Sequence, residues 1–335
     1  MISQKWVRLL AVSTLSLSLI SAPAALATDK PLICLAYDEG GRGDQSFNDA
    51  AALGLQKAQK KAVFTLETVV TDGSSQDREK RLRSLAVKKC AIIIAIGSGY
   101  APTVSLLSLE FPDSQFAILN DESIESAAVA SVIFSEPQSA FLAGLSAALI
   151  SKSGKVAMIT APNQSASYEV GFKAGVIASK KKVSSFVKYV EGPGQVETRA
   201  LIAAGADVIF LALPGSNSAV LKTIVSSNQL KTRKGENIVG LIGVAPDQFL
   251  SVTPASQKFI YATVVKRVDI AIEDLIEKTL SGDFYTDILD AEKGIYGFDY
   301  GISGSAISLT TYLPALTALT PVINRLAPQG AKLKP

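Results

Sequence analysis

The chain has 335 residues and a net charge of only +3, from 33 basic and 30 acidic residues, and it has no histidine. The basic residues are spread out, and we interpret the short cluster 180–182 as a solvated helix end, so no nucleic-acid partner is expected. The lack of histidine excludes Ser-His-Asp and Cys-His catalysis and removes the commonest metal ligand. We expect no cofactor, and the length is enough for two domains of ordinary size.

Residues 1–27 are predicted to be a secretory signal peptide. Lys5 and Arg8 open it, an apolar run follows, and Ala25-Leu26-Ala27 forms an A-x-A end. Because the run is shorter than the ~20 residues that a membrane span needs, we favour cleavage after Ala27 over an uncleaved anchor. Cys34 lies too far inside the chain to be a lipobox cysteine, so we expect an exported, unlipidated protein.

Residues 31–61 predict a strand, a glycine-rich loop and a helix. An apolar run (32–37) ends at a polar loop (38–45), and Ser46 is predicted to cap the helix with Asp49 three residues later. Such a turn marks the carboxyl end of a strand in an open α/β sheet, where ligands bind.

Four side chains are expected to converge at this turn: Asp38, Asp44, Phe47 and Asn48. Two carboxylates, an amide and an aromatic face fit a small polar ring compound. An ordinary βα turn with Phe47 in the core is the alternative.

The rest of the chain alternates strands and helices. Strands are predicted at 64–70, 91–96, 116–119, 155–160, 186–190, 207–213, 238–243 and 260–265, and helices at 46–61, 76–89, 101–110, 137–151, 165–180, 195–204, 216–227 and 266–281. Continuous apolar strands are typical of sheets covered by helices on both faces. The strands are too many for one compact sheet, so we predict an α/β fold with two doubly wound parallel-sheet lobes.

The two cysteines, Cys34 and Cys90, each begin an apolar strand, and we expect these strands to be neighbours. An exported protein favours a disulfide, whereas adjacent parallel strands give poor bridge geometry. A disulfide and two buried thiols both remain open.

The loop Asp38–Asn48 resembles the D-x-G-G-x-x-D-x-S-F-N signature of the basic membrane protein family, the PnrA-like solute-binding components of ABC transporters. The resemblance continues in the family's order through residues 116–121, 140–144, 171–175, 205–210, 242–244 and 264–267. It implies the type I periplasmic-binding-protein fold, with a three-strand hinge and chain crossings near 121–135, 246–249 and 284–292. The implied N-lobe holds 29–128 and 248–285, and the implied C-lobe holds 129–247 and 286–327.

The resemblance also implies a function: a non-catalytic binding protein, monomeric, that carries a small solute to the permease subunits of an ABC importer, with a purine nucleoside as the best guess. The implied ligand contacts are hydrogen bonds from Asp38, Asn48 and Asp121, stacking by Phe47, a sugar contact from Lys266, and a place in the site for Gly243. Asp44 and Asp247 are further candidates. Asp121 as a turn cap and Lys266 as a solvated helix residue are the alternatives.

Three stretches depart from the family pattern, one of them being residues 212–216, which stand in place of an Ala-Gly-Gly-type loop. Ala245 stands where the family has an acidic residue that grips the ribose, and Glu191–Gly194 replaces a second stacking aromatic. Tyr100 or Tyr168 would have to substitute for that ring.

Other function classes are less consistent with the sequence. The stretch Gly41-x-Gly43 is not followed by the third glycine of a dinucleotide fingerprint. An exported nucleoside hydrolase would need an activating constellation around Asp38, Asp44 or Lys266 that is absent from the sequence. A binder of another small polar solute and a sensor-type receptor domain remain as alternatives.

Overall fold

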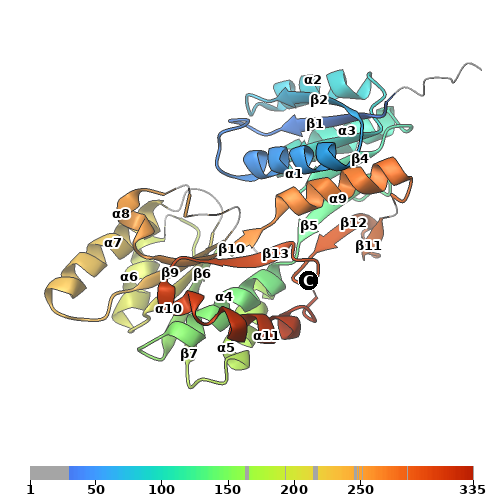
Figure 1. Cartoon of the computed structure of the whole chain (residues 1–335). Helices are drawn as coiled ribbons and strands as arrows, with labels where there is room; N and C mark the ends of the chain where they lie inside the picture. The colour runs from blue at the N-terminus through green and yellow to red at the C-terminus, as the bar shows by residue number, and fades with distance from the viewer. Residues whose placement is uncertain are drawn as a thin grey trace, which may run out of the picture. The chain divides into compact units, whose positions relative to one another are not determined.

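The computed structural model describes residues 30–162, 166–192, 194–213, 218–244, 247, 249–250, 252–284 and 286–334. The predicted signal peptide, Pro193 and Ala245 lie outside this part of the chain. Strands and helices alternate, and the strands form two sheets (Figure 1). None of the helices in the described ranges is long and apolar enough to span a membrane.

The first sheet has seven strands and carries the glycine-rich loop. Its order is β11 (Asp287–Asp290), β12 (Ile295–Tyr300), β5 (Val129–Phe134), β4 (Phe116–Leu119), β3 (Ile92–Ile96), β1 (Leu32–Tyr37) and β2 (Thr65–Val70). All neighbours are parallel except the edge pair β11–β12.

Helices cover both faces of this sheet. Because successive strand residues point to opposite faces, Ile33 and Leu35 enter one core and Cys34 and Ala36 enter the other. The first core is covered by α1 (Phe47–Lys61) and α9 (Val268–Ser281), which lie side by side although far apart in the sequence (Figure 1). The second is covered by α2 (Ser75–Ala86), the 3₁₀ turn η1 (Ser98–Tyr100) and α3 (Ala101–Glu110).

The second sheet has six strands in the order β13 (Ile307–Thr311), β10 (Ile260–Lys266), β9 (Gly240–Val244), β8 (Val208–Ala212), β6 (Lys155–Thr160) and β7 (Ser184–Tyr189). Only the edge pair β10–β13 is antiparallel. One face packs on α4 (Glu136–Ile150) and α5 (Ala166–Ala178), the other on α6 (Gln195–Ala203) and α7 (Ser218–Arg233). The short helices are α8 (Pro254–Gln257) and α10 (Pro314–Thr317), and α11 (Thr320–Gly330) packs on α4 and α5. The predicted pair of doubly wound sheets is confirmed.

Two glycines of α5 explain why its sequence repeats glycine every four residues. A Cβ added at Gly171 would lie 2.1 Å from the carbonyl oxygen of Pro137 in α4, and one at Gly175 would lie 2.1 Å from that of Phe141. Only glycine therefore lets the two helix backbones approach this closely.

The chain passes between the sheets three times: after Phe134, after Lys266, and between Tyr300 and Ile307. The first crossing falls in the interval that the sequence predicts, but the other two come later in the chain. The reason is strand pairing: β10 extends the second sheet beside β9, while β5, β11 and β12 belong to the first sheet. We therefore propose lobes of 31–134 plus 267–300 and of 135–266 plus 301–334, in place of the predicted boundaries.

Cys34 and Cys90 are joined by a disulfide, with their Cα atoms 5.9 Å apart. The objection to a disulfide was that both cysteines would lie within neighbouring parallel strands, where the bridge geometry is poor. In register, however, Cys34 lies opposite Ile93, and Cys90 precedes the first residue of β3. Cys90 is thus outside the ladder, where its side chain can reach across to the buried Cys34.

Candidate functional site

The loop after β1 depends on glycine. Gly41 has φ +55°, and its amide donates a 3.1 Å hydrogen bond to the carbonyl oxygen of Asp38. A Cβ at this buried position would also lie 3.1 Å from Val70. Left-handed backbone and close packing together leave room for glycine alone.

Asp44 caps the N-terminus of α1. Its carboxylate accepts hydrogen bonds from the backbone amides of Ser46 (2.8 Å), Asn48 (3.1 Å) and Asp49 (3.2 Å). The predicted Ser46 cap is wrong, because the Ser46 side chain makes no capping bond. Asp44 reaches the free amides of the first turn from two residues upstream and satisfies them itself. Both of its carboxylate oxygens are used by the protein.

Asp49 closes the same loop from the helix side. Its carboxylate accepts from the amides of Gly43 (2.7 Å) and Gln45 (2.9 Å). The predicted capping box is therefore wrong in both halves, because the Ser46 amide donates to Asp44 and Asp49 binds amides of the preceding loop.

Asn48 fixes the backbone at the end of β1. The side chain is buried; its Oδ1 accepts from the Asp38 amide at 3.0 Å, and its Nδ2 donates to the carbonyls of Asp38 and Glu39, both at 3.4 Å. The amide predicted to contact a ligand therefore holds the loop in place. The neighbouring Phe47 is half-buried and packs against the core.

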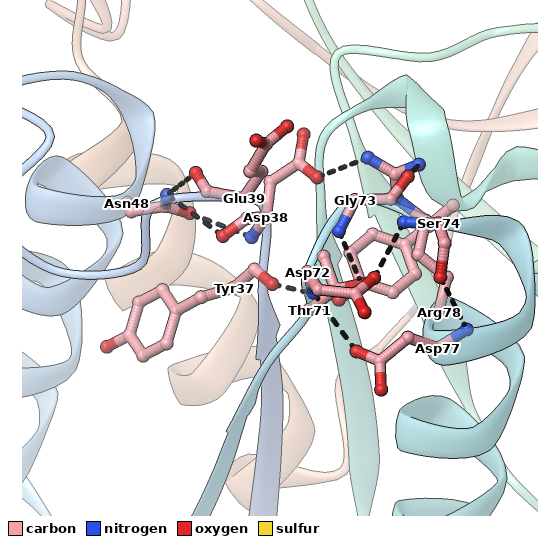
Figure 2. A network of polar contacts seen from close by, with 11 residues as sticks. Tyr37, Asp38, Glu39, Asn48, Thr71, Asp72, Gly73, Ser74, Asp77 and Arg78 are labelled. Atoms are coloured by element: carbon pink, nitrogen blue, oxygen red, sulfur yellow. Dashed lines mark hydrogen bonds and ion pairs between the residues drawn. The ribbon is translucent and has the colours of Figure 1, made fainter.

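Asp38 is held by an arginine that the sequence analysis missed. Arg78 Nη2 donates to Asp38 Oδ1 at 2.7 Å, and Arg78 Nη1 donates to the Gly73 carbonyl at 2.6 Å (Figure 2). The charged run around Arg78 suggests a solvated helix face. The sequence did carry one signal. Leu82 and Leu85 follow Arg78 at intervals of four and three residues, which puts all three on one face of the helix, and the two leucines are fully buried.

Tyr100 and Tyr168 are core residues. The Tyr100 hydroxyl donates to the Tyr37 carbonyl at 2.8 Å, and Tyr168 packs on Phe210 with ring centroids 6.3 Å apart. Burial raises the pKa of both phenols well above the ordinary value. Neither ring is placed as the second stacking surface that the sequence analysis required.

A cavity of about 440 Å³ lies at the carboxyl ends of β4 and β5 and at the first turns of α4 and α5. It is lined by Asn120, Asp121, Glu122, Ile133, Phe134, Ser135, Glu136, Ala166 and Ser167. Asp121 Oδ1 accepts from the amide of Ser123 at 2.9 Å and from its hydroxyl at 2.7 Å, so it closes a turn while lining the cavity. The cavity wall thus offers carboxylate and amide oxygens as acceptors.

Lys266 ends β10 beside this cavity. Its amine is buried and lies 3.4 Å from Oδ1 of Asn120, a cavity residue. Burial lowers the pKa of Lys266, and the nearby charge of Glu136 acts in the opposite direction. The predicted alternative, a solvated helix residue, is wrong because the chain is still in the strand at this position and α9 begins at Val268.

Two further candidates lie in the second sheet region. Gly243 is in β9 opposite Thr263, and Asp247 accepts hydrogen bonds from the Tyr312 hydroxyl and, at 3.1 Å, from the Phe249 amide. The rings of Phe249 and Tyr312 stack with centroids 3.8 Å apart. Burial raises the pKa of Asp247.

The described residues include no group of three or more His, Cys, Asp or Glu side chains placed to hold a metal ion. The arrangement provides a polar cavity with acceptor oxygens and a buried amine beside it, and the loop after β1 carries a half-buried aromatic ring. Acceptor oxygens and a buried amine are groups that can hydrogen-bond a small polar molecule.

Comparison with known proteins identifies the family. A family model described as ABC transporter substrate-binding protein PnrA-like (Bmp) matches residues 33–304. A CD4+ T-cell-stimulating antigen from Listeria innocua is 29% identical over 296 residues, covering 84% of this chain and 80% of the relative. The ABC transporter nucleoside-binding protein BmpA from Lactococcus lactis is 25% identical over 262 residues, covering 74% of each chain. In structure, an ABC transporter system solute-binding protein from Conexibacter woesei superposes with a TM-score of 0.64 at 17% identity, covering 90% of this chain and 98% of that one.

Proposed function

Because this chain belongs to the family of PnrA-like ABC transporter substrate-binding proteins, we propose that its solute is a purine nucleoside, bound without chemical change and passed to a membrane permease. The family accounts for the general role as the solute-binding component of a transporter. The nucleoside is our inference.

One observation carries the choice of solute: the cavity of about 440 Å³ combines acceptor oxygens with a buried amine at its edge. A nucleoside presents N–H groups on its base and hydroxyls on its sugar. Asp121, Glu122 and Glu136 line the cavity and accept from such donors. Lys266 donates to a sugar hydroxyl in this proposal, in exchange for its long contact with Asn120.

Asp38 and Phe47 complete the proposed site from the loop after β1. A base stacked on an aromatic ring gains about 1–3 kcal/mol. A site that hydrogen-bonds its ligand also rejects analogues lacking those groups, because its own buried polar atoms are then left unpaired. The relative named as a nucleoside-binding protein supports this reading at 25% identity.

A thermal-shift screen of ligand-stripped mature protein tests the proposal. Nucleosides, free bases, sugars and amino acids are compared. A ligand at 100 times its dissociation constant adds about 2.7 kcal/mol to the free energy of unfolding, which raises the melting temperature by several degrees. A shift with adenosine, guanosine or inosine supports the proposal, and a response to another class alone contradicts it.

Lys266→Ala separates sugar from base recognition. We expect this change to weaken adenosine binding at least fivefold more than adenine binding, because only adenosine offers the ribose hydroxyl. Lys258→Ala, an exposed lysine near the end of α8, is the matched control and should leave both affinities unchanged. Equal losses for adenosine and adenine would contradict the sugar contact.

The export signal is also open to test. We propose that the mature protein begins at Thr28, works outside the cytoplasmic membrane as a monomer, and carries no lipid. N-terminal sequencing of the exported protein checks the start at Thr28, and mass measurement checks that no lipid is attached. Light scattering checks that the protein is a monomer.

A further inference from the structure

Arg78 is enclosed in a way that a solvated helix arginine is not. Its side chain is only 15% exposed, and its guanidinium lies over the Tyr100 ring, 5.6 Å from the centroid. One Nη atom donates to Asp38 and the other to the carbonyl of Gly73 (Figure 2). Its Nε is buried and has no hydrogen-bond partner among the described residues.

The backbone after β3 leaves room for both members of this pair. A Cβ at Gly99 would lie 2.6 Å from the Arg78 guanidinium carbon. A Cβ at Gly97, where φ is +101°, would lie 2.8 Å from Asp38 Oδ2. The Gly97-Ser98-Gly99 turn is therefore shaped around an arginine and a carboxylate, and not only around the chain reversal.

Asp38 is fixed from two directions. Asn48 holds its backbone, and Arg78 holds one carboxylate oxygen, Oδ1. The carboxylate is still 34% exposed, so it is only partly covered by these contacts. Without Arg78, a half-buried carboxylate would lose its counter-charge and rotate away from this orientation.

We propose that Arg78 is a positioning residue for the binding site: it fixes Asp38 so that the second carboxylate oxygen meets an N–H or O–H donor of the solute. This inference rests on the proposed function, in which Asp38 contacts the ligand. Arg78 itself does not touch the solute.

The geometry requires arginine rather than lysine. A planar guanidinium bonds Asp38 and Gly73 at the same time while it stacks on Tyr100. A lysine ammonium supplies the charge but not this fork. Arg78→Lys should therefore restore only part of the function that Arg78→Met removes.

A double-mutant cycle on ligand affinity tests the proposal. Calorimetric titration with adenosine is carried out on the wild type, Arg78→Met, Asp38→Ala and the double variant. We expect Arg78→Met to weaken adenosine at least tenfold in the wild-type background, and less than twofold when Asp38 is already alanine. Arg78→Lys should fall between Arg78→Met and the wild type.

Arg83→Met is the matched control. Arg83 lies on the same helix and pairs at the surface with Glu79 and Glu110, so its loss removes the same charge away from the site. Adenosine affinity should not change. Equal losses from Arg78→Met in both Asp38 backgrounds would overturn the proposal, as would unchanged affinity in the single variant.

The same four proteins separate this inference from the proposed function. If the wild type binds no nucleoside, the proposed function fails, and urea unfolding without ligand then decides on the pair. If the double variant loses clearly less in its urea midpoint than the two single variants lose together, the fixing of Asp38 by Arg78 is supported. Additive midpoint losses overturn it.

Discussion

Asp269 joins α1, which follows the glycine-rich loop, to α9, which follows the second crossing. Its carboxylate, only 4% exposed, accepts from Lys57 Nζ of α1 at 2.6 Å and from Arg267 Nε and Nη2 at 2.8 and 2.7 Å. Close packing supports the contact, because a Cβ at Gly54 of α1 would lie 2.7 Å from the Asp269 carbonyl oxygen. Asp269→Asn removes the charge and keeps the shape.

The size of the effect follows from the pKa. Burial alone would raise the pKa of Asp269, but hydrogen bonds and charges from Arg267 and Lys57 outweigh it and lower the pKa from 3.8 to about 2. Since one pKa unit corresponds to about 1.4 kcal/mol, ionised Asp269 stabilises the fold by about 2 kcal/mol. The folded-state pKa is the lower one, so this stabilisation is complete above about pH 4 and is lost as the pH falls towards 2.

Urea unfolding of the wild type and Asp269→Asn, at steps from pH 7 to pH 3, measures this directly. We expect a difference of about 2 kcal/mol at pH 7 that narrows below pH 4. Glu277→Gln is the control and should leave the midpoint unchanged. Glu277 lies on α9, as Asp269 does, but it is exposed and pairs at the surface with Lys61 of α1. A difference that stays constant down to pH 3, or none at pH 7, would refute the reasoning.

Three further changes have defined outcomes. Phe47→Ala should weaken nucleoside binding at least tenfold in calorimetry while the circular dichroism spectrum is retained, and unchanged affinity would exclude stacking. Gly175→Ala should lower stability in thermal unfolding by about 1–3 kcal/mol or more, because the new Cβ meets the Phe141 carbonyl at 2.1 Å, and an unchanged melting temperature would show that α4 and α5 can separate freely. Replacing Cys34 and Cys90 by alanine should cost roughly 4 kcal/mol by loop closure, given their sequence separation of 56, and urea midpoints equal to the wild type would contradict the bridge.

Most of the continuous apolar strands were predicted, but Val129–Phe134 was not, although it is largely buried and apolar except for Ser131. Ile92–Ile96 and Val208–Ala212 are fully buried in the two sheets, and their sequences contain little else but branched and small apolar residues. The last strands were missed because their sequences lack this pattern. Ile295–Tyr300 contains Gly297 and Asp299, and Ile307–Thr311 is mostly serine and threonine.

The missed strands also explain the misplaced crossings. Because β11 and β12 were not recognised as strands, the predicted third crossing out of the first lobe came too early in the chain. β10 was recognised as a strand, but a parallel strand can extend either sheet, and only its pairing with β9 assigns it. Local sequence carries no information on that choice.

For the site, the sequence located polar positions better than their partners. Strand-end reasoning correctly placed Asp38 and Asp121 just after β1 and β4, since parallel strands all end at one edge. It did not reveal that the side chains of Asn48 and Asp44 would bond to the backbone of the loop and of the first helical turn. A short polar side chain near the start of a helix can either bind a ligand or bond to the nearby backbone, and the backbone conformation decides which of the two occurs.

The two cations at the second crossing show how the site and the scaffold meet. Lys266 and Arg267 are consecutive, yet Lys266 lies beside Asn120 at the cavity and Arg267 is bound to Asp269 at the start of α9. The Arg267 amide also donates to the Ala306 carbonyl at 2.7 Å, in the segment that forms the third crossing. A single peptide bond therefore joins Lys266, which lies beside the cavity residue Asn120, to Arg267, which binds the carboxylate that also holds Lys57 of α1.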